Sequence, residues 1–151
     1  MDIKDKMSIR RMRKKDIPFF NSLRNECSSF LHDQRKYSLE ESFEWFEKEH
    51  PKFFILEFDG EKIGYFRTSI EGANFFIGLD IHKNWRGKGL ATTAYEIFLD
   101  KIKKIANIKE AYLKVLTKNK VALNLYRKLG FVEIRREMIG NKESIEMRIE
   151  L

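Results

Sequence analysis

A short basic and glycine-rich segment, Arg86-Gly87-Lys88-Gly89-Leu90-Ala91, has the composition of a phosphate-binding turn. It separates a strand-like run, residues 75–81, from an amphipathic helix that we expect to begin near Leu90. The first N–H groups of a helix have no intrahelical partner, and the helix dipole places partial positive charge at that end. The glycines remove side chains that would block an anion, and Arg86 and Lys88 add formal charge. The segment therefore predicts a binding site for a diphosphate.

A glycine-relaxed loop with solvated basic side chains is the competing interpretation, and a short Gly-x-Gly does not separate the two. A second motif downstream favours the binding site. Residues 119–131 read Asn-Lys-Val-Ala-Leu-Asn-Leu-Tyr-Arg-Lys-Leu-Gly-Phe. Their apolar residues share one helical face that includes Tyr126, and Gly130 is a natural helix terminator. Taken alone, Tyr126 would be a tyrosine of the core.

The elements that must position these motifs form a mixed α/β (α+β) domain. The apolar periodicity and the turn signals predict seven strands, at residues 8–12, 53–58, 62–69, 75–81, 111–116, 131–136 and 144–149. Four helices are expected to begin near Asp16, Ser38, Leu90 and Asn119. The expected sheet is twisted and mostly antiparallel. Only the strands joined by the long helix should be parallel, because such a connection is a crossover.

Length and composition indicate one packed domain over residues 1–151. The chain is 42% hydrophobic with thirteen Phe, which is enough for a real core. No stretch approaches the roughly 20 apolar residues of a membrane span, and no secretory signal is visible. The single cysteine, Cys27, cannot form an internal disulfide. We therefore expect a cytoplasmic protein without a membrane partner.

The net charge of +7 favours acidic partners such as nucleotides, phosphorylated metabolites or nucleic acid. The one basic cluster, residues 10–15, alternates into a short strand and a loop, so a solvated surface is the simpler interpretation. No zinc-finger, ribonucleoprotein or helix-turn-helix pattern is present, and we expect no nucleic-acid partner. The three histidines, His32, His50 and His82, are too scattered to predict a metal site.

With both motifs in this order, the chain resembles the GNAT superfamily of acyl-CoA-dependent N-acetyltransferases. The phosphate turn of that family reads Gln/Arg-x-x-Gly-x-Gly/Ala, and the matching residues here are Arg86, Gly89 and Ala91. Its later motif reads Asn-x-x-Ala-x-x-x-Tyr-x-x-x-Gly-Phe, and the matching residues are Asn119, Ala122, Tyr126, Gly130 and Phe131. The separation of the motifs and the order of elements also agree. The resemblance therefore covers nearly the whole chain.

The resemblance implies a GNAT-like domain that uses acetyl-CoA as co-substrate and no metal. The backbone N–H groups of the turn would hold the coenzyme A pyrophosphate; its residues are Arg86, Gly87, Lys88, Gly89, Leu90 and Ala91. The pantetheine arm would enter a gap between the strand ending at Ile81 and the strand holding Val115. Backbone groups of Leu79 and Ile81 would bond the arm as an added strand would.

The resemblance also assigns roles near the reacting atoms. The Ile81 N–H would polarise the thioester carbonyl, which is an oxyanion-type contribution. Asn119 lies where the family contacts the coenzyme arm, and Tyr126 would protonate the departing thiolate. A primary amine is mostly protonated at neutral pH and must lose a proton before it attacks, so a general base assists.

The general base is not settled by the resemblance. Some family members carry a Glu five residues before the Asn of the later motif, and this chain has Lys114 there. Asp80 and His82 are the remaining candidates, since both neighbour Ile81. Attack by the free amine, with water as the proton acceptor, is the alternative.

The acceptor is expected to be a primary amine bound beside the N-terminal helices. Polar and basic residues gather in the two N-terminal helices and their loop: Arg24, Asn25, His32, Asp33, Gln34, Arg35 and Lys36. This set suggests an anionic small amine, for instance a nucleotide-linked amino sugar, rather than a polyamine. A protein or peptide N-terminus is the alternative acceptor. A non-catalytic coenzyme A-binding module, a basic nucleic-acid binder and a homodimer stay open.

Overall fold

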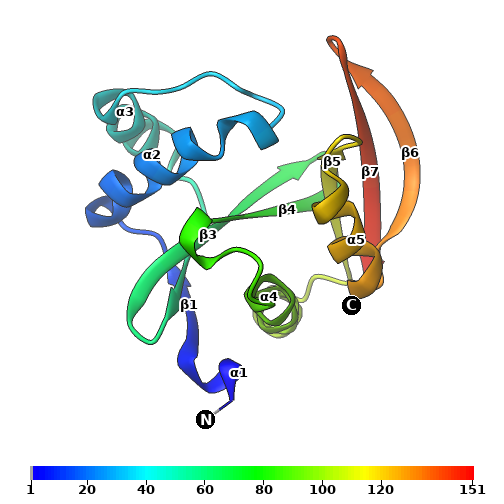
Figure 1. Ribbon diagram of the computed structural model, residues 1–151, viewed down its shortest axis with the longest axis horizontal. Coiled ribbons are helices and arrows are strands. Elements are labelled where there is room, and N and C mark those ends of the chain that lie inside the picture. The colour runs from blue at the N-terminus through cyan, green and yellow to red at the C-terminus, as the bar shows by residue number, and fades with distance from the viewer. Residues whose placement is uncertain (1) are drawn as a thin grey trace.

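A twisted seven-stranded sheet organises the computed structural model, which describes residues 2–151 (Figure 1). The strand order is β1-β2-β3-β4-β5-β7-β6. The strands are β1 (Met7–Arg11), β2 (Phe54–Phe58), β3 (Glu61–Glu71), β4 (Asn74–Ile81), β5 (Glu110–Leu116), β6 (Val132–Ile139) and β7 (Lys142–Glu150). The helices are α1 (Ile3–Lys6), α2 (Ile17–Glu26), α3 (Leu39–Glu49), α4 (Leu90–Ala106) and α5 (Lys120–Leu129). Three short 3-10 turns are η1 (Lys14–Asp16), η2 (Ser28–Phe30) and η3 (Lys83–Trp85).

The expected sheet is confirmed. Every pair of neighbouring strands is antiparallel except β4 and β5, which are parallel and joined by a crossover through α4. The short helix α1 was not expected, so the described chain has five α-helices where the sequence predicted four. None of the described helices is long and apolar enough to span a membrane.

Alternation along the central strands divides the core between the two faces of the sheet. Leu56 and Phe66 pack with α4 and α5 on one face, whereas Ile55 and Tyr65 pack with α2 and α3 on the other. The α4 face is apolar along its buried stripe, and Phe98 stacks on Phe66 with ring centroids 4.1 Å apart. Because both faces are covered, the middle of the sheet is a rigid support for whatever its edges hold.

Local sequence signals determine where α3 begins and ends. Ser38 and Glu41 form the capping box that their spacing predicts, since each side chain accepts the other residue's backbone N–H. The helix α3 ends at His50, whose φ of 47° is left-handed and is followed by Pro51. Asn119 caps α5 by accepting the Ala122 N–H at 3.3 Å.

The sequence predicts that Asp16 caps α2 and that Ile105 belongs to the apolar face of α4, and both expectations are wrong. Asp16 precedes α2, but its carboxylate does not cap the helix. It is fully buried and instead bonds Arg10, Lys62 and the backbone N–H of Arg13, which ties the start of α2 to the sheet. A buried carboxylate gains more from two cations than from one backbone donor. At the far end of α4, Ile105 is 74% exposed because the sheet ends before that turn of the helix.

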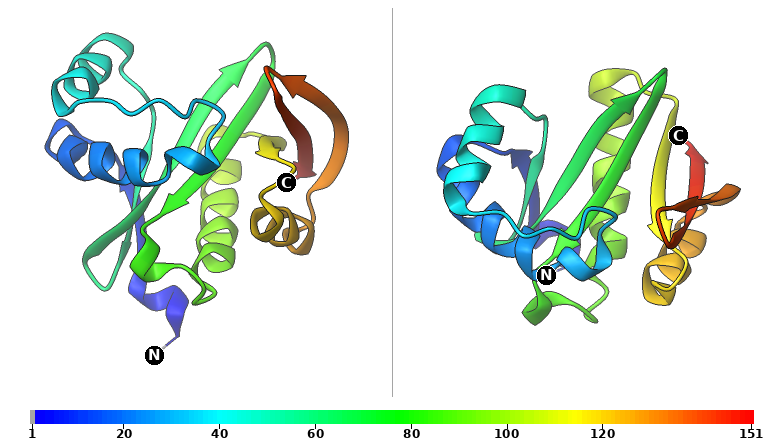
Figure 2. Two further views of the ribbon diagram at one scale, coloured as in Figure 1. Left: turned by 45° about the horizontal axis from the view of Figure 1, so that its top comes forward. Right: turned by 90° about the horizontal axis from the view of Figure 1, so that it is seen from above.

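The strands β4 and β5 diverge, and this opens the sheet in its centre. Their register contains the pair Phe76–Tyr112, near the start of each strand. From there the two strands form a V, with α4 and α5 beginning at its open end (Figure 2). His82 donates its N–H to Ile63 O on β3. By alternation, the backbone groups of Leu79 and Ile81 point away from β3 and into the gap.

Candidate active site

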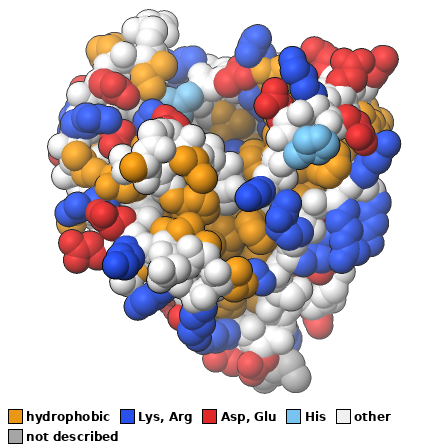
Figure 3. Space-filling model, turned by 180° about the vertical axis from the view of Figure 1, so that it is seen from behind, with side chains coloured by type: hydrophobic (Ala, Val, Ile, Leu, Met, Phe, Trp, Pro, Cys, Tyr) orange, Lys and Arg blue, Asp and Glu red, His pale blue; other side chains and the backbone are white. Residues whose placement is uncertain are grey.

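A cavity of about 510 Å³ occupies the open end of the V, and we call it the β4–β5 cavity. Its walls come from the C-terminal end of β4, the turn before α4, β5, α5 and the segment that follows α2. Leu79, Asp80 and Ile81 all line it. From behind, the molecular surface is hollowed over apolar side chains near the middle of the face, with charged side chains around them (Figure 3).

The turn before α4 is shaped to admit an anion. Gly87 and Gly89 have φ values of 72° and 76°, a left-handed conformation that glycine adopts without strain. A Cβ atom built at either glycine would meet nothing within 4 Å, so the space in front of both is open. Both line the cavity together with Arg86, Leu90 and Ala91. Lys88 is not among the lining residues. The free N–H groups at the start of α4 therefore face a space large enough for a diphosphate.

The Arg86 side chain does not extend toward the open space of the turn. Its Nε donates to Ile81 O at 2.8 Å, and its terminal nitrogen donates to Glu26 at 2.8 Å and to Cys27 Sγ at 3.0 Å. The guanidinium also lies over the Phe30 ring, 5.4 Å from its centroid. Arg86 thus fastens the turn to β4 and to the end of α2. The Arg86 guanidinium is thus engaged by protein groups, and the backbone N–H groups of the turn remain as the candidate anion donors.

Tyr126 lies at the inner end of the cavity as a buried hydroxyl. The Tyr95 hydroxyl donates to it at 3.4 Å, and the Tyr126 ring packs edge-on against Tyr95 and Phe131. Burial raises the pKa of Tyr126, while the Tyr95 hydrogen bond and the Arg67 charge lower it to a lesser extent. The hydroxyl therefore stays protonated at neutral pH and can donate a proton.

Asp80 and Arg67 form a charged pair beside that hydroxyl. Arg67 Nε donates to Asp80 Oδ2 at 3.2 Å, and the Asp80 carboxylate is almost fully buried. Gly78 makes the pair possible, because a Cβ there would stand 2.5 Å from the Arg67 guanidinium. The charges of Arg67 and Asp80 both act on the pKa of Tyr126, so the three groups belong to one electrostatic unit.

The other candidates from the sequence lie apart from that unit or are occupied. His82 is outside the cavity lining, and its Nδ1 accepts the Asn84 N–H at the start of η3. Asn119 lines the cavity, although its side-chain oxygen caps α5. Lys114 lines the cavity and pairs with Glu71 at 3.1 Å. Burial raises the pKa of Cys27 to about 12, so its thiol is not a ready nucleophile.

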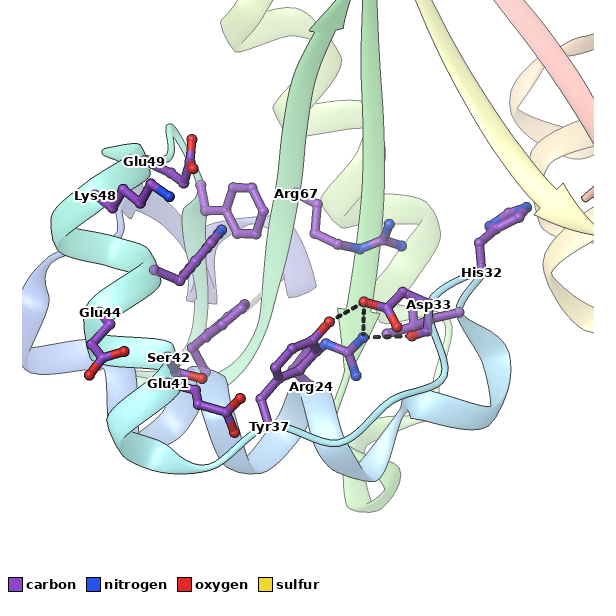
Figure 4. Close-up of a pocket in the computed structure, with 14 residues that line it drawn as sticks. Arg24, His32, Asp33, Tyr37, Glu41, Ser42, Glu44, Lys48, Glu49 and Arg67 are labelled. Atoms are coloured by element: carbon purple, nitrogen blue, oxygen red, sulfur yellow. Dashed lines mark hydrogen bonds and ion pairs between the residues drawn. The ribbon is translucent and has the colours of Figure 1, made fainter.

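A second cavity of about 600 Å³ lies between α2, α3 and β3, and we call it the α2–α3 cavity (Figure 4). It meets the β4–β5 cavity at three residues that line both: Leu31, His32 and Arg67. Aromatic rings of Phe20, Trp45, Phe53 and Tyr37 form much of its wall. Phe20 stacks on Trp45 with centroids 5.0 Å apart.

The charges of the α2–α3 cavity are unevenly placed. The helix α3 contributes Glu41, Glu44 and Glu49, none of which has an ion-pair partner within residues 2–151. Asp33 pairs with Arg24 and Arg35, and its hydrogen bonds from Arg35 and Tyr37 lower the pKa of its carboxylate. Lys48 also belongs to the α3 side, whereas Arg67 stands at the junction with the β4–β5 cavity (Figure 4). The α3 side of the cavity therefore carries three carboxylates and one ammonium group, and the junction carries the Arg67 guanidinium with its partner Asp80.

The sequence did not identify Arg67 as a residue of the site. It also did not predict that the two cavities join at Leu31, His32 and Arg67. One signal was available for Arg67: a glycine inside a strand often marks the close approach of another group. Gly78 stands opposite Arg67 in the β3–β4 register. His32 was noticed only as a polar residue of the first loop. Its contact with Ser144, 112 residues away, has no local signature in the sequence.

A family model described as the acetyltransferase (GNAT) family matches residues 17–131. A spermidine N(1)-acetyltransferase of Escherichia coli is 30% identical over 142 residues, which cover 83% of this chain and 72% of that protein. An N-alpha-acetyltransferase of Sulfurisphaera tokodaii is 30% identical over 96 residues, or 55% of this chain, and the match spans only 58% of that relative's length. Among solved structures, the fold is similar to a spermidine N-acetyltransferase from Vibrio cholerae in complex with CoA and spermine. The TM-score is 0.87 at 24% identity, over 97% of this chain and 96% of that one.

Proposed function

This chain belongs to the GNAT family of acetyltransferases and is an acetyl-CoA-dependent N-acetyltransferase, and we propose that its acceptor is a terminal primary amine of a diamine or polyamine cation. The observation that carries the proposal is the charge arrangement of the α2–α3 cavity. Within residues 2–151, the carboxylates of Glu44 and Glu49 on α3 have no ion-pair partner, and the Arg67 guanidinium lies where that cavity meets the β4–β5 cavity.

The donor fits the β4–β5 cavity by shape and by backbone chemistry. An extended pantetheine arm matches the gap that the backbone groups of Leu79 and the N–H of Ile81 face, while the Ile81 carbonyl accepts from Arg86 Nε. A diphosphate matches the open turn at Gly87 and Gly89. We assign Tyr126 as the proton donor to the leaving thiolate and the Ile81 N–H to the thioester carbonyl. Bound acetyl-CoA supplies an activated acyl group, and the chain positions it against the amine.

The acceptor follows from what each end of the α2–α3 cavity attracts. Near Arg67, a positive amine is disfavoured relative to its neutral form, because like charges lower the pKa of an ammonium group. Along α3, a second ammonium meets Glu44 and Glu49, and the aromatic wall favours cations over its ring faces. A substrate with two amines can place one amine near Arg67 and the other along α3. We therefore propose transfer to the inner amine while the outer ammonium anchors the substrate.

An anionic acceptor, which the sequence suggested, finds no support in this cavity. Its phosphate or carboxylate groups would meet the four carboxylates of the lining: Asp33, Glu41, Glu44 and Glu49. The spermidine acetyltransferase among the relatives acts on a polyamine, which agrees with the proposal. A peptide N-terminus is the second candidate, because an N-alpha-acetyltransferase is among the relatives that are 30% identical to this chain.

Neutralising the α3 carboxylates tests the proposal. We expect the double variant Glu44→Gln/Glu49→Gln to raise KM for spermidine about tenfold, because each exposed ion pair is worth up to about 1 kcal/mol. The variant should leave KM for acetyl-CoA and for butylamine unchanged, since butylamine has no outer ammonium. Steady-state thiol release at pH 7.5 measures all three constants.

A matched control is Glu47→Gln on the same helix. Glu47 pairs with Lys14 at 2.9 Å and lies outside the α2–α3 cavity lining. The Glu47→Gln variant removes one negative charge from α3 but leaves the two proposed anchor residues, Glu44 and Glu49, in place. If the double variant changes spermidine and butylamine equally, or if Glu47→Gln has the same effect, the outer-ammonium anchor is wrong.

A further inference from the structure

His32 lies where the two cavities join, and the residue roles proposed above do not include it. It is one of the three residues that line both the α2–α3 cavity and the β4–β5 cavity. An amine that moves from the first cavity to the thioester end of the second passes these residues. Leu31 has no proton chemistry and the Arg67 guanidinium cannot accept a proton, so His32 is the group at the junction that can.

A contact with β7 holds the His32 ring in place. Its Nε2 lies 2.7 Å from Ser144 Oγ on β7, and Ser144 is almost completely buried. Lys142 Nζ reaches the His32 carbonyl at 3.5 Å. On the other side, Arg24 donates to the carbonyl of Arg35 at 2.8 Å and holds the loop. The imidazole is therefore positioned before a substrate arrives.

The surroundings of His32 keep its ring neutral. Burial lowers the pKa of His32 most, and the charges of Arg67 on β3, Lys114 on β5 and Lys142 on β7 lower it further. Glu137 on β6 acts in the opposite direction, and Asp33 on the same loop is paired with Arg24 and Arg35. The proton-accepting form consequently prevails at neutral pH.

We propose that His32 takes the first proton from the acceptor ammonium as the amine crosses from the α2–α3 cavity into the β4–β5 cavity. In the tautomer that donates Nε2–H to Ser144 Oγ, the Nδ1 lone pair accepts that proton. This step rests on the proposed amine acceptor, but it requires only a primary ammonium and not a second one. Arg67 assists, because its charge favours the neutral amine over the ammonium.

The protons of the reaction then balance. The ammonium gives one proton to His32, and the nitrogen lone pair forms the bond to the thioester carbonyl carbon. The carbon–sulfur bond breaks, and the Tyr126 hydroxyl protonates the sulfur. The second nitrogen proton passes to Asp80 and returns to Tyr126 through solvent. His32 releases its proton to solvent, which accounts for the one proton that amide formation from an ammonium liberates.

The test is the pH profile of kcat/KM for butylamine and spermidine with the wild type and His32→Gln. Gln can still bond Ser144, so the loop anchor is retained. We expect His32→Gln to lose about a hundredfold in kcat/KM at pH 7. The loss should shrink toward pH 10, because the amine then arrives already neutral. In the wild type, activity should fall only below about pH 6.5, the ordinary pKa of histidine, since the neutral form is favoured.

Two controls separate this proton role from a structural one. His50→Asn replaces a histidine at a left-handed position that Asn tolerates, outside both cavities, and should leave the profile unchanged. Ser144→Ala frees the ring and should give a smaller loss with the same pH shape. A loss by His32→Gln that is equal at every pH, or no loss, would overturn the proposal.

Nuclear magnetic resonance of the imidazole adds a measurement that does not need turnover. Adding butylamine or spermidine to the CoA complex should shift the His32 ring signals, and unchanged signals would contradict contact with the amine. If butylamine is acetylated but spermidine is not preferred, the diamine acceptor fails while the His32 profile is still measured on butylamine. The two proposals are thus distinguishable.

Discussion

Replacing Tyr126 with phenylalanine is expected to lower kcat about a hundredfold or more, with the Kd of acetyl-CoA unchanged. The hydroxyl is the proton donor for the leaving thiolate in our account, and burial raises the pKa of Tyr126 so that it remains protonated. Phenylalanine keeps the ring that packs against Tyr95 and Phe131. The substitution removes one oxygen atom and little packing. Single-turnover thiol release and calorimetry with acetyl-CoA measure the two quantities separately.

The matched control for Tyr126→Phe is Tyr112→Phe. The Tyr112 hydroxyl contacts Glu110 at 3.4 Å and lies outside both cavities. This control removes a tyrosine hydroxyl without touching the site and should retain full activity. If Tyr126→Phe keeps wild-type turnover, or if it weakens acetyl-CoA binding as much as it lowers turnover, the assignment of Tyr126 as a proton donor fails.

Asp80→Asn should have the second largest effect, a loss of about a hundredfold in kcat/KM for the amine. Asp80 receives the second nitrogen proton in our account, and an amide cannot accept it. Asn still offers an oxygen to Arg67 Nε, which donates to the carboxylate at 3.2 Å. Removing the Asp80 charge also costs stability, although solvent reaches 39% of the Arg67 side chain and screens the pair. Chemical denaturation must therefore accompany the kinetics, so that activity is expressed per folded molecule.

An exposed aspartate provides the control for Asp80→Asn. Asp100 pairs with Lys104 on the solvent side of α4 at 3.0 Å, and such a pair contributes little. Asp100→Asn should leave both stability and kcat/KM nearly unchanged. Should Asp80→Asn keep its activity once its folded fraction is accounted for, water rather than Asp80 takes the proton.

Much of the fold could be predicted from local signals. The Asp59-Gly60 hairpin, the Ser38 capping box and the α4 crossover each depend on a few adjacent residues, and each forms as expected. Both motifs sit at helix starts, where glycine and Asn have backbone roles that the sequence displays directly. For the same reason, the turn at Gly87 and Gly89 could be placed without a structure.

The chemistry of the acceptor side could not be predicted, because it depends on contacts between distant segments. His32 meets Ser144 across the sheet, and Arg67 reaches Asp80 only because Gly78 leaves room. The basic loop suggested an anionic acceptor. In the structure, however, Arg24 and Arg35 are engaged by Asp33 and by backbone carbonyls, whereas Glu44 and Glu49 on α3 have no ion-pair partner in the described chain. Counting charges along a sequence does not show which of them are already paired.

The most direct test of the central claim compares four acceptors with the wild-type enzyme and acetyl-CoA. The acceptors are spermidine, butylamine, a nucleotide-linked amino sugar and a peptide with a free N-terminus. The charge arrangement of the α2–α3 cavity predicts that kcat/KM for spermidine exceeds that for butylamine about tenfold, with the other two slower still. Acetylation of the amino sugar or the peptide in preference to spermidine would contradict a diamine or polyamine acceptor.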